Sequence, residues 1–236
     1  MGRHSNVQLL AAKIGQIQLA MHKKLLPKIK KQTQARSELA VQNILEAAES
    51  VFDEHEPIDL NARHLAAKAG YSVGTLYYYL NKAEDAFIWM IIKRREKQFT
   101  ALADLINTCP ADKPLQTLLG ELIDSSFSEY RRMNPRSFFL VFRMIMKFSK
   151  NPLAFDDALK TLVEPLLRAQ QRDTTGTFRQ TDADELLMLL KTCFGMIRRP
   201  FLEQSPVAGS DKHKALALDT MVRLLGNSPL SPQQIQ

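Results

Sequence analysis

A short stretch of the sequence combines hydroxyl side chains with an arginine and several small residues. Ser72 and Thr75 precede three consecutive tyrosines, Tyr77–Tyr79, and Arg63 lies nine residues before Ser72. Hydroxyl groups donate hydrogen bonds to phosphate oxygens, and an arginine fork matches the O6 and N7 acceptors of guanine. These residue types could therefore supply the chemistry that recognises a nucleic acid.

Two short helices must position these side chains. We predict helices over about 60–69 and 73–79, with Ala66 as the small residue where the two backbones meet and Gly70 as the corner between them. This arrangement is typical of a helix-turn-helix, whose second helix enters the major groove of DNA. A helix cannot expose three consecutive side chains equally, so one tyrosine belongs to the core, and Tyr79 is the candidate.

The stretch from about Ile44 to Phe87 resembles the tetracycline-repressor (TetR) family of bacterial regulators. The resemblance lies in an Ile-Leu-x-Ala-Ala-x-x-x-Phe run ending at Phe52 and in the block Leu65-Ala66-x-x-Ala69-Gly70-Tyr71-Ser72-x-Gly74-Thr75-Leu76-Tyr77-Tyr78-Tyr79-Leu80. The chain departs from the family pattern at three places. The usual glycine after the first helix is replaced by Asp53-Glu54-His55-Glu56-Pro57, the usual phenylalanine by Leu80, and the usual lysine by Ala83, with Lys82 one position earlier.

The resemblance implies two kinds of DNA contact. The residues expected at base edges are Arg63, Val73, Gly74, Thr75 and Tyr78. The residues expected at backbone phosphates are Ser72, Tyr77, Tyr79 and Lys82. A threonine or valine methyl group can meet the methyl group of thymine, which makes this division physically reasonable.

The excess positive charge of the chain lies at its N-terminus. The formal net charge is +7, and residues 1–36 hold eight Lys and Arg residues and no Asp or Glu. A cationic arm beside a nearly neutral body indicates a polyanionic partner, and we expect Lys30, Lys31 and Arg36 to contact the DNA backbone or minor groove. The alternatives are a solvated tail, a natural start at Met21, or a membrane-surface helix with a short apolar stripe.

The sequence as a whole predicts an all-α protein, because glycine is scarce and apolar residues recur at spacings of three and four. We expect a basic extension over 1–35, a three-helix helix-turn-helix DNA-binding domain over 36–83, a helical effector-binding and dimerisation domain over 84–228, and a tail over 229–236. Further helices are predicted at about 37–52, 84–107, 114–132, 135–149, 152–171, 182–203 and 210–225.

Residues 137–148 are apolar nearly all round, which predicts a buried helix. Aromatic and methionine residues in and near it could line a pocket for an apolar effector, although most such residues are simply core. The candidates are Phe127, Phe138, Phe142, Met146 and Phe155. Arg143 lies within the apolar run, and a buried cation needs a partner, either a protein carboxylate or an anionic ligand head.

We find no arrangement of residues suited to catalysis. The five histidines have no metal-ligand spacing with each other or with Cys109 and Cys193, and no phosphate-binding glycine loop occurs. We therefore expect neither an enzyme nor a cofactor. Two widely spaced cysteines fit reduced thiols, and no run reaches the roughly 18 apolar residues of a membrane span, so we expect a cytoplasmic protein.

The resemblance implies a repressor that binds a double-stranded DNA operator as a homodimer through its two C-terminal helices and is released by a small-molecule effector. The alternative is a helical interaction module that binds a lipid or membrane surface and carries a non-functional helix-turn-helix. That alternative predicts liposome binding that depends on residues 1–36.

Overall fold

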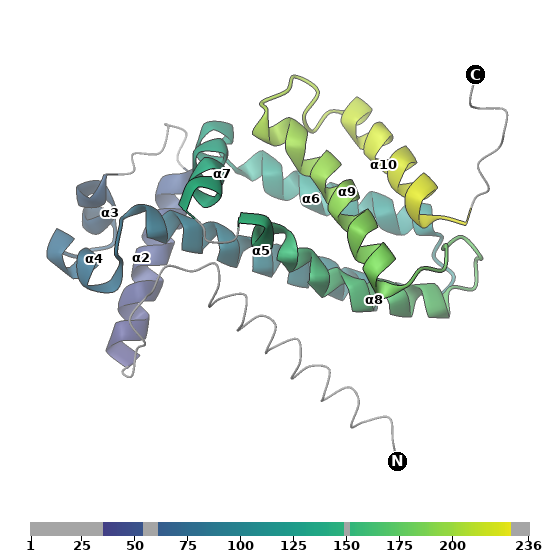
Figure 1. The fold of residues 1–236 in the computed structure, drawn as a ribbon, viewed down its shortest axis with the longest axis horizontal. Helices are drawn as coiled ribbons and strands as arrows, with labels where there is room; N and C mark the ends of the chain where they lie inside the picture. Colours follow the sequence, from purple (N-terminus) through teal and green to yellow (C-terminus); the bar gives the residue numbers. More distant parts are fainter. Residues whose placement is uncertain (1–34, 54–60, 149–151, 228–236) are drawn as a thin grey trace, which may run out of the picture. The chain divides into compact units, whose positions relative to one another are not determined.

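The structure is a computed structural model that describes residues 35–53, 61–148 and 152–227, without the side chains of 35–38, 148 and 152–155. In this part of the chain all regular elements are helical (Figure 1). They are α2 (Ala35–Asp53), α3 (Ala62–Lys68), α4 (Val73–Tyr79), α5 (Glu84–Asn107), α6 (Leu115–Arg132), α7 (Pro135–Phe148), the 3-10 helix η1 (Pro152–Leu159), α8 (Lys160–Arg172), α9 (Ala183–Leu202) and α10 (Asp211–Leu225). The predicted all-α class is confirmed.

The predicted helices agree closely with those observed, with one exception. The ranges 73–79 and 84–107 coincide with α4 and α5. The single helix predicted over 152–171 is wrong, because the segment begins as η1 and becomes α-helical only at Lys160. A 3-10 start is common at helix N-termini, where the first backbone groups lack i−4 partners.

Side-chain caps explain why several helices begin where they do. The carboxamide of Asn61 accepts the backbone N–H of Arg63 before α3, and Ser72 Oγ accepts the N–H of Thr75 at the start of α4. Asp182 and Ser210 cap α9 and α10 in the same way. Each cap satisfies a backbone donor that has no partner inside the helix.

The backbone divides into two units. One comprises Met1–Arg95 with Arg136–Asp157, and the other comprises Glu96–Pro135 with Ala158–Gln236. Helix α5 therefore contributes to both units, and α7 belongs with the first, so these units do not coincide with the predicted boundary between residues 83 and 84. The predicted domain boundaries separate segments according to their expected function, and they stay a prediction.

The core of the first unit joins the helix-turn-helix to α2 and the start of α5. Ile44, Ala48 and Phe52 of α2 lie four residues apart and are all buried. They share the core with Leu65 of α3 and Leu76 of α4, each fully buried. Because residues four apart occupy one helix face, this spacing fixes which side of α2 faces the core.

The second unit is a helical bundle in which α6 contacts α9 and α10, and α9 also contacts α8 and α10. Phe127 of α6 lies in edge-to-face contact with Phe201 of α9, with 5.5 Å between ring centroids. The ring of the buried His213 of α10 lies tilted against that of Phe127, with 4.6 Å between the ring centroids. These rings hold three helices of the bundle together.

Candidate nucleic-acid interface

The turn between α3 and α4 is made by the backbone of Gly70. Its φ is 74°, and its N–H donates to the carbonyl of Ala67 at 3.1 Å. The next N–H, of Tyr71, reaches back to the carbonyl of Ala66 at 2.9 Å and ends α3. No atom lies within 4 Å of where a Cβ of residue 70 would stand, so glycine is required by the backbone conformation alone. The predicted corner is confirmed.

A hydrogen bond from α2 fixes the residue that follows the turn. Asn43 Nδ2 donates to the hydroxyl of Tyr71 at 3.0 Å in a half-buried position. Sequence reasoning missed Asn43, because a partner 28 residues away leaves no local signal. The pair orients the turn on α2.

Helix α4 turns one face to the core and the opposite face to solvent. Leu76 has no exposed surface, whereas Tyr77 is 50% and Tyr78 is 59% exposed. Tyr79 is half-buried, and its ring meets that of Tyr78 edge to face with centroids 5.0 Å apart. The outward direction predicted for Tyr77 and Tyr78 is confirmed, and Tyr79 is intermediate between core and surface.

The first turn of α4 carries two coupled hydroxyl groups. Ser72 Oγ and Thr75 Oγ1 lie 2.9 Å apart, and Ser72 Oγ also accepts the Thr75 N–H at 3.0 Å. One of the two hydroxyl groups donates its proton to the other, so the second hydroxyl proton remains available as a donor. Ser72 is exposed and Thr75 is half-buried, so the pair lies at the edge of the outward face. Val73 is half-buried and Gly74 is exposed beside them.

Charge in this region is of one sign. Residues 61–83 contain Arg63, Lys68 and Lys82 and no Asp or Glu, and these three side chains are exposed. The backbone N–H of Lys82 donates to Asp85 Oδ2 at 3.0 Å, just before α5. Burial raises the pKa of Asp85, although this hydrogen bond acts in the opposite direction. The exposed surface of the helix-turn-helix is therefore suited to an anionic partner.

A half-buried arginine of α5, Arg94, forms an ion pair with α2. Arg94 Nη1 lies 2.8 Å from Asp53 Oδ1 and 2.9 Å from Asp53 Oδ2. The guanidinium carbon also lies 5.8 Å from the centre of the Phe52 ring, and only 11% of the Arg94 side chain is exposed. The sequence gives no signal for this pair, which joins residues 41 positions apart.

Three predicted DNA contacts cannot be placed. Lys30 and Lys31 lie outside the described residues, and the side chain of Arg36 does as well, although its backbone is part of α2. Their contact with DNA stays a prediction.

Helix α7 differs from its predicted character. Met146 is 40% and Phe139 is 39% exposed, and Arg143 is exposed with its guanidinium 5.8 Å from the centre of the Phe139 ring. The prediction of a helix buried all round, with a buried cation at Arg143, is therefore wrong. The error arose because aromatic residues on the outer face of an amphipathic helix look like core in sequence. Among the described residues of this unit, the buried cation is Arg95, which is 4% exposed and lies 3.6 Å from Asp156.

The remaining effector-pocket candidates fall into different parts of the structure. Phe138 is buried and Phe142 half-buried on α7, in the first unit. Phe127 belongs to the aromatic core of the second unit, and the side chain of Phe155 lies outside the described residues. Their role in ligand binding stays a prediction.

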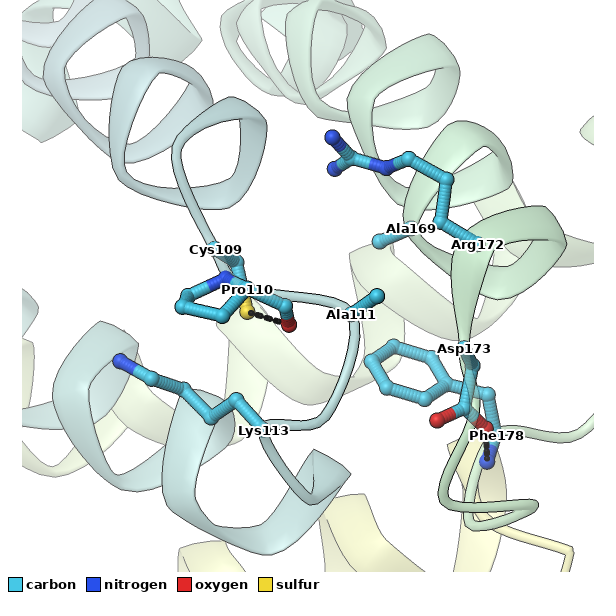
Figure 2. A pocket seen from close by; sticks show the side chains of 8 residues that line it. All are labelled: Cys109, Pro110, Ala111, Lys113, Ala169, Arg172, Asp173 and Phe178. Carbon is cyan, nitrogen blue, oxygen red and sulfur yellow. Dashed lines mark hydrogen bonds between the residues drawn. The ribbon is translucent and has the colours of Figure 1, made fainter.

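A shallow pocket of the second unit lies where α5, α6 and α8 end or begin (Figure 2). Its charged side chains already have partners within the protein. Lys113 Nζ contacts Glu121 at 2.7 Å, Asp173 accepts the N–H of Phe178 at 3.1 Å, and Arg172 donates to backbone carbonyls at the end of α5. Burial also raises the pKa of the Cys109 thiol, which disfavours a reactive thiolate. These contacts connect helix ends and are not arranged for chemistry.

Metal binding and membrane insertion find no support in the described residues. Within them, no cluster of three or more His, Cys, Asp or Glu side chains is placed to bind a metal ion. None of the helices described combines the length and the apolar character that crossing a membrane requires.

No protein-family model and no curated protein matches the chain. Among solved structures, a putative TetR-family transcriptional regulator from Mesorhizobium loti is similar with a TM-score of 0.57 and 15% identity, over 81% of this chain and 95% of that chain. The fatty acid degradation regulator FadR from Bacillus halodurans gives a TM-score of 0.54 and 19% identity, over 80% of this chain and 99% of FadR. SmeT, the repressor of the Stenotrophomonas maltophilia multidrug efflux pump SmeDEF, gives a TM-score of 0.52 and 19% identity, over 83% of this chain and 95% of SmeT. The chain therefore has the fold of TetR-family regulators.

Proposed function

We propose that this protein is a sequence-specific DNA-binding transcriptional regulator. The observation that carries the proposal is the placement of α4, which is fixed by Leu76 and Gly70 on one side and exposes Tyr77 and Tyr78 on the other. A short helix supported in this way on a surface with basic and no acidic side chains suits the major groove of DNA. Arg63, Val73, Gly74 and Thr75 are the proposed base contacts, together with Tyr78. The proposed phosphate contacts are Ser72, Tyr77, Tyr79, Lys82, Lys30, Lys31 and Arg36.

The regulator acts as a homodimer in this proposal, through α9 and α10. Met188 on α9 is 63% exposed and Leu216 on α10 is 56% exposed, so each of the two helices has a large apolar side chain in contact with solvent. A two-fold pairing of this surface would cover them. The operator is then a near-palindrome with half-sites about 34 to 36 Å apart, one turn of DNA.

The proposed sign of regulation is repression that a small molecule relieves. Among the similar structures, SmeT is named a repressor of an efflux pump and FadR a regulator of fatty acid degradation. A small molecule that binds the DNA-incompetent conformation better would shift the population away from the operator. The proposed lining residues are Phe127, Phe138, Phe142, Arg143, Met146 and Phe155.

Selection of duplexes from a random pool, followed by fluorescence-anisotropy titration, tests the proposal. The selected duplex should bind at least about a thousandfold more tightly than a shuffled duplex of the same composition at physiological salt. Binding that depends on salt but does not distinguish the two duplexes would overturn it. Co-sedimentation with anionic liposomes that depends on residues 1–36, without any preferred duplex, would support the membrane-surface alternative instead.

A further inference from the structure

Helix α4 lacks every side chain that recognises a base through a pair of hydrogen bonds. Its residues, Val73–Tyr79, include no Arg, Lys, Asn, Gln, Asp or Glu. Arginine and lysine are the usual partners of guanine, asparagine and glutamine of adenine, and the carboxylates of cytosine. For contact with bases, α4 can therefore use only hydroxyl groups, methyl groups, aromatic rings and its own backbone.

The hydroxyl groups at the start of α4 are poorly suited to distinguishing bases. Thr75 Oγ1 lies 2.9 Å from Ser72 Oγ, and the Thr75 N–H donates to the same oxygen at 3.0 Å. These two bonds hold the polar part of Thr75 against the helix start. A hydroxyl can also donate or accept, so it fits several bases. The methyl group of Thr75 is the part of this side chain that remains for recognition.

The neighbours of Thr75 are apolar or very small. Val73 offers two methyl groups, and Gly74 offers no side chain while lying exposed. A Cβ at position 74 would only come within 3.7 Å of Ser72 Oγ, so the fold itself has room for a larger residue there. The missing side chain lets the backbone of α4 approach a base pair closely.

We propose that α4 reads its operator chiefly through the 5-methyl groups of thymine. This inference rests on the proposed function, and it makes Val73 and Thr75, together with the exposed ring of Tyr78, the residues of α4 that determine specificity. The thymine methyl is the one apolar group that the bases present in the major groove, and aliphatic or aromatic side chains are what recognise it. Guanine recognition then falls to α3, where Arg63 is exposed.

Substitution of uracil for thymine tests the inference, because uracil keeps every hydrogen-bonding group and lacks only the methyl. The probe is the duplex that the protein selects from a random pool, with each thymine replaced singly by deoxyuridine. Affinity should fall about fourfold at each contacted thymine, the value expected for one buried methyl group. Thymines outside the contacted positions provide an internal control and should show no change.

A protein variant without the matching methyl identifies the residue involved. Thr75→Ser keeps the hydroxyl that pairs with Ser72 and removes only the methyl group. This variant should bind the parent duplex more weakly and become insensitive to uracil at one position in each half-site, while the other positions keep their effect. Tyr77→Phe, which removes the hydroxyl proposed to bind a phosphate, should weaken binding to all of these duplexes equally.

The two proposals fail in different ways. If the selected duplex is preferred over a shuffled one but every uracil duplex binds as tightly as the parent, methyl readout is overturned and the regulator stands. If selection recovers no preferred duplex at all, the proposed function fails and this inference fails with it.

Discussion

Gly70 and Gly74 lie four positions apart in the helix-turn-helix and serve different ends. At Gly70 the backbone has a φ of 74°, which a residue with a Cβ rarely adopts. Gly74 has an ordinary helical conformation with room for a side chain. Gly70 is therefore needed for the turn, whereas in our proposal Gly74 lets α4 lie close to DNA.

Gly70→Ala should therefore destabilise the protein by about 1 to 2 kcal/mol, the cost of a left-handed conformation for a residue with a Cβ. Gly74→Ala is the matched control and should stabilise α4 by about 0.5 to 1 kcal/mol, because alanine is the better helix former. Urea denaturation followed by circular dichroism measures both. Equal effects of the two substitutions would contradict the assigned role of the turn.

His213 is a buried histidine held neutral by its surroundings. The backbone N–H of Gly209 donates to His213 Nδ1 at 3.1 Å, so the ring proton resides on Nε2, which lies 3.3 Å from the carbonyl oxygen of Met196. Burial lowers the pKa of His213 below its ordinary value of 6.5, although the contact with Met196 acts in the opposite direction. Protonation would remove the acceptor for Gly209.

The stability of the protein should consequently depend on pH through His213. Because the unfolded state binds the proton more readily, the contribution of His213 is complete above pH 6.5 and is lost as the pH falls from there toward the folded-state pKa. Denaturation at several pH values between about 8 and 5 measures it. Between these two pH values, the free energy of unfolding should fall less in His213→Gln than in the wild type. If the free energy of unfolding changes with pH in the same way in both proteins, His213 is not the source of the pH dependence.

At the scale of elements, the ion pair between Arg94 and Asp53 joins α5 to the end of α2. The guanidinium lies near the C-terminus of α2, where a cation also complements the helix dipole, and it contacts the Phe52 ring. The exposed fraction of the Arg94 side chain is only 11%, so solvent screens this pair less than an ordinary surface pair.

Arg94→Met should lower the free energy of unfolding by about 1.5 to 3 kcal/mol, the range for hydrogen bonds to charged groups. An exposed lysine of the same helix provides the control, since Lys97→Met should change stability by less than about 0.5 kcal/mol. Urea denaturation of both variants and of Asp53→Asn tests the pairing. If Arg94→Met is as mild as Lys97→Met, the pair does not stabilise the packing of α2 on α5.

The sequence predicted the helices well because their starts are encoded locally. Ser72 and Asp182 are caps, and Gly70 marks a turn that only glycine makes easily. Features that join distant positions could not be predicted in this way. The hydrogen bond from Asn43 to Tyr71 and the exposure of Arg143 depend on which helices meet, and periodicity along one helix does not contain that information.

For the whole molecule, the distribution of charge suggests two modes of DNA contact. Helices α3 and α4 provide a small specific surface, and residues 1–34 carry seven of the 32 Lys and Arg residues without any Asp or Glu. Contacts to phosphate release counterions and strengthen binding without regard to sequence. The arm should therefore raise affinity for all DNA, and the helix-turn-helix should supply the preference.

Removal of residues 1–34 should weaken the dependence of binding on salt while preserving the preferred sequence. The slope of log affinity against log salt concentration should become shallower by up to about six for each arm of the dimer, because each phosphate that an arm no longer neutralises contributes close to 0.9. Anisotropy titrations at several salt concentrations, with selected and shuffled duplexes, measure slope and preference together. An unchanged slope would place the arm away from DNA.

The central claim is that the exposed face of α4 lies against base pairs. A photoreactive phenylalanine derivative in place of Tyr78 measures this directly, with the same derivative in place of Val207 as a control, since both side chains are exposed and Val207 lies outside the proposed DNA and dimer surfaces. The account predicts that position 78 crosslinks to the selected duplex at two sites about one helical turn apart and that position 207 does not crosslink. A bound duplex that fails to crosslink at position 78 would contradict it.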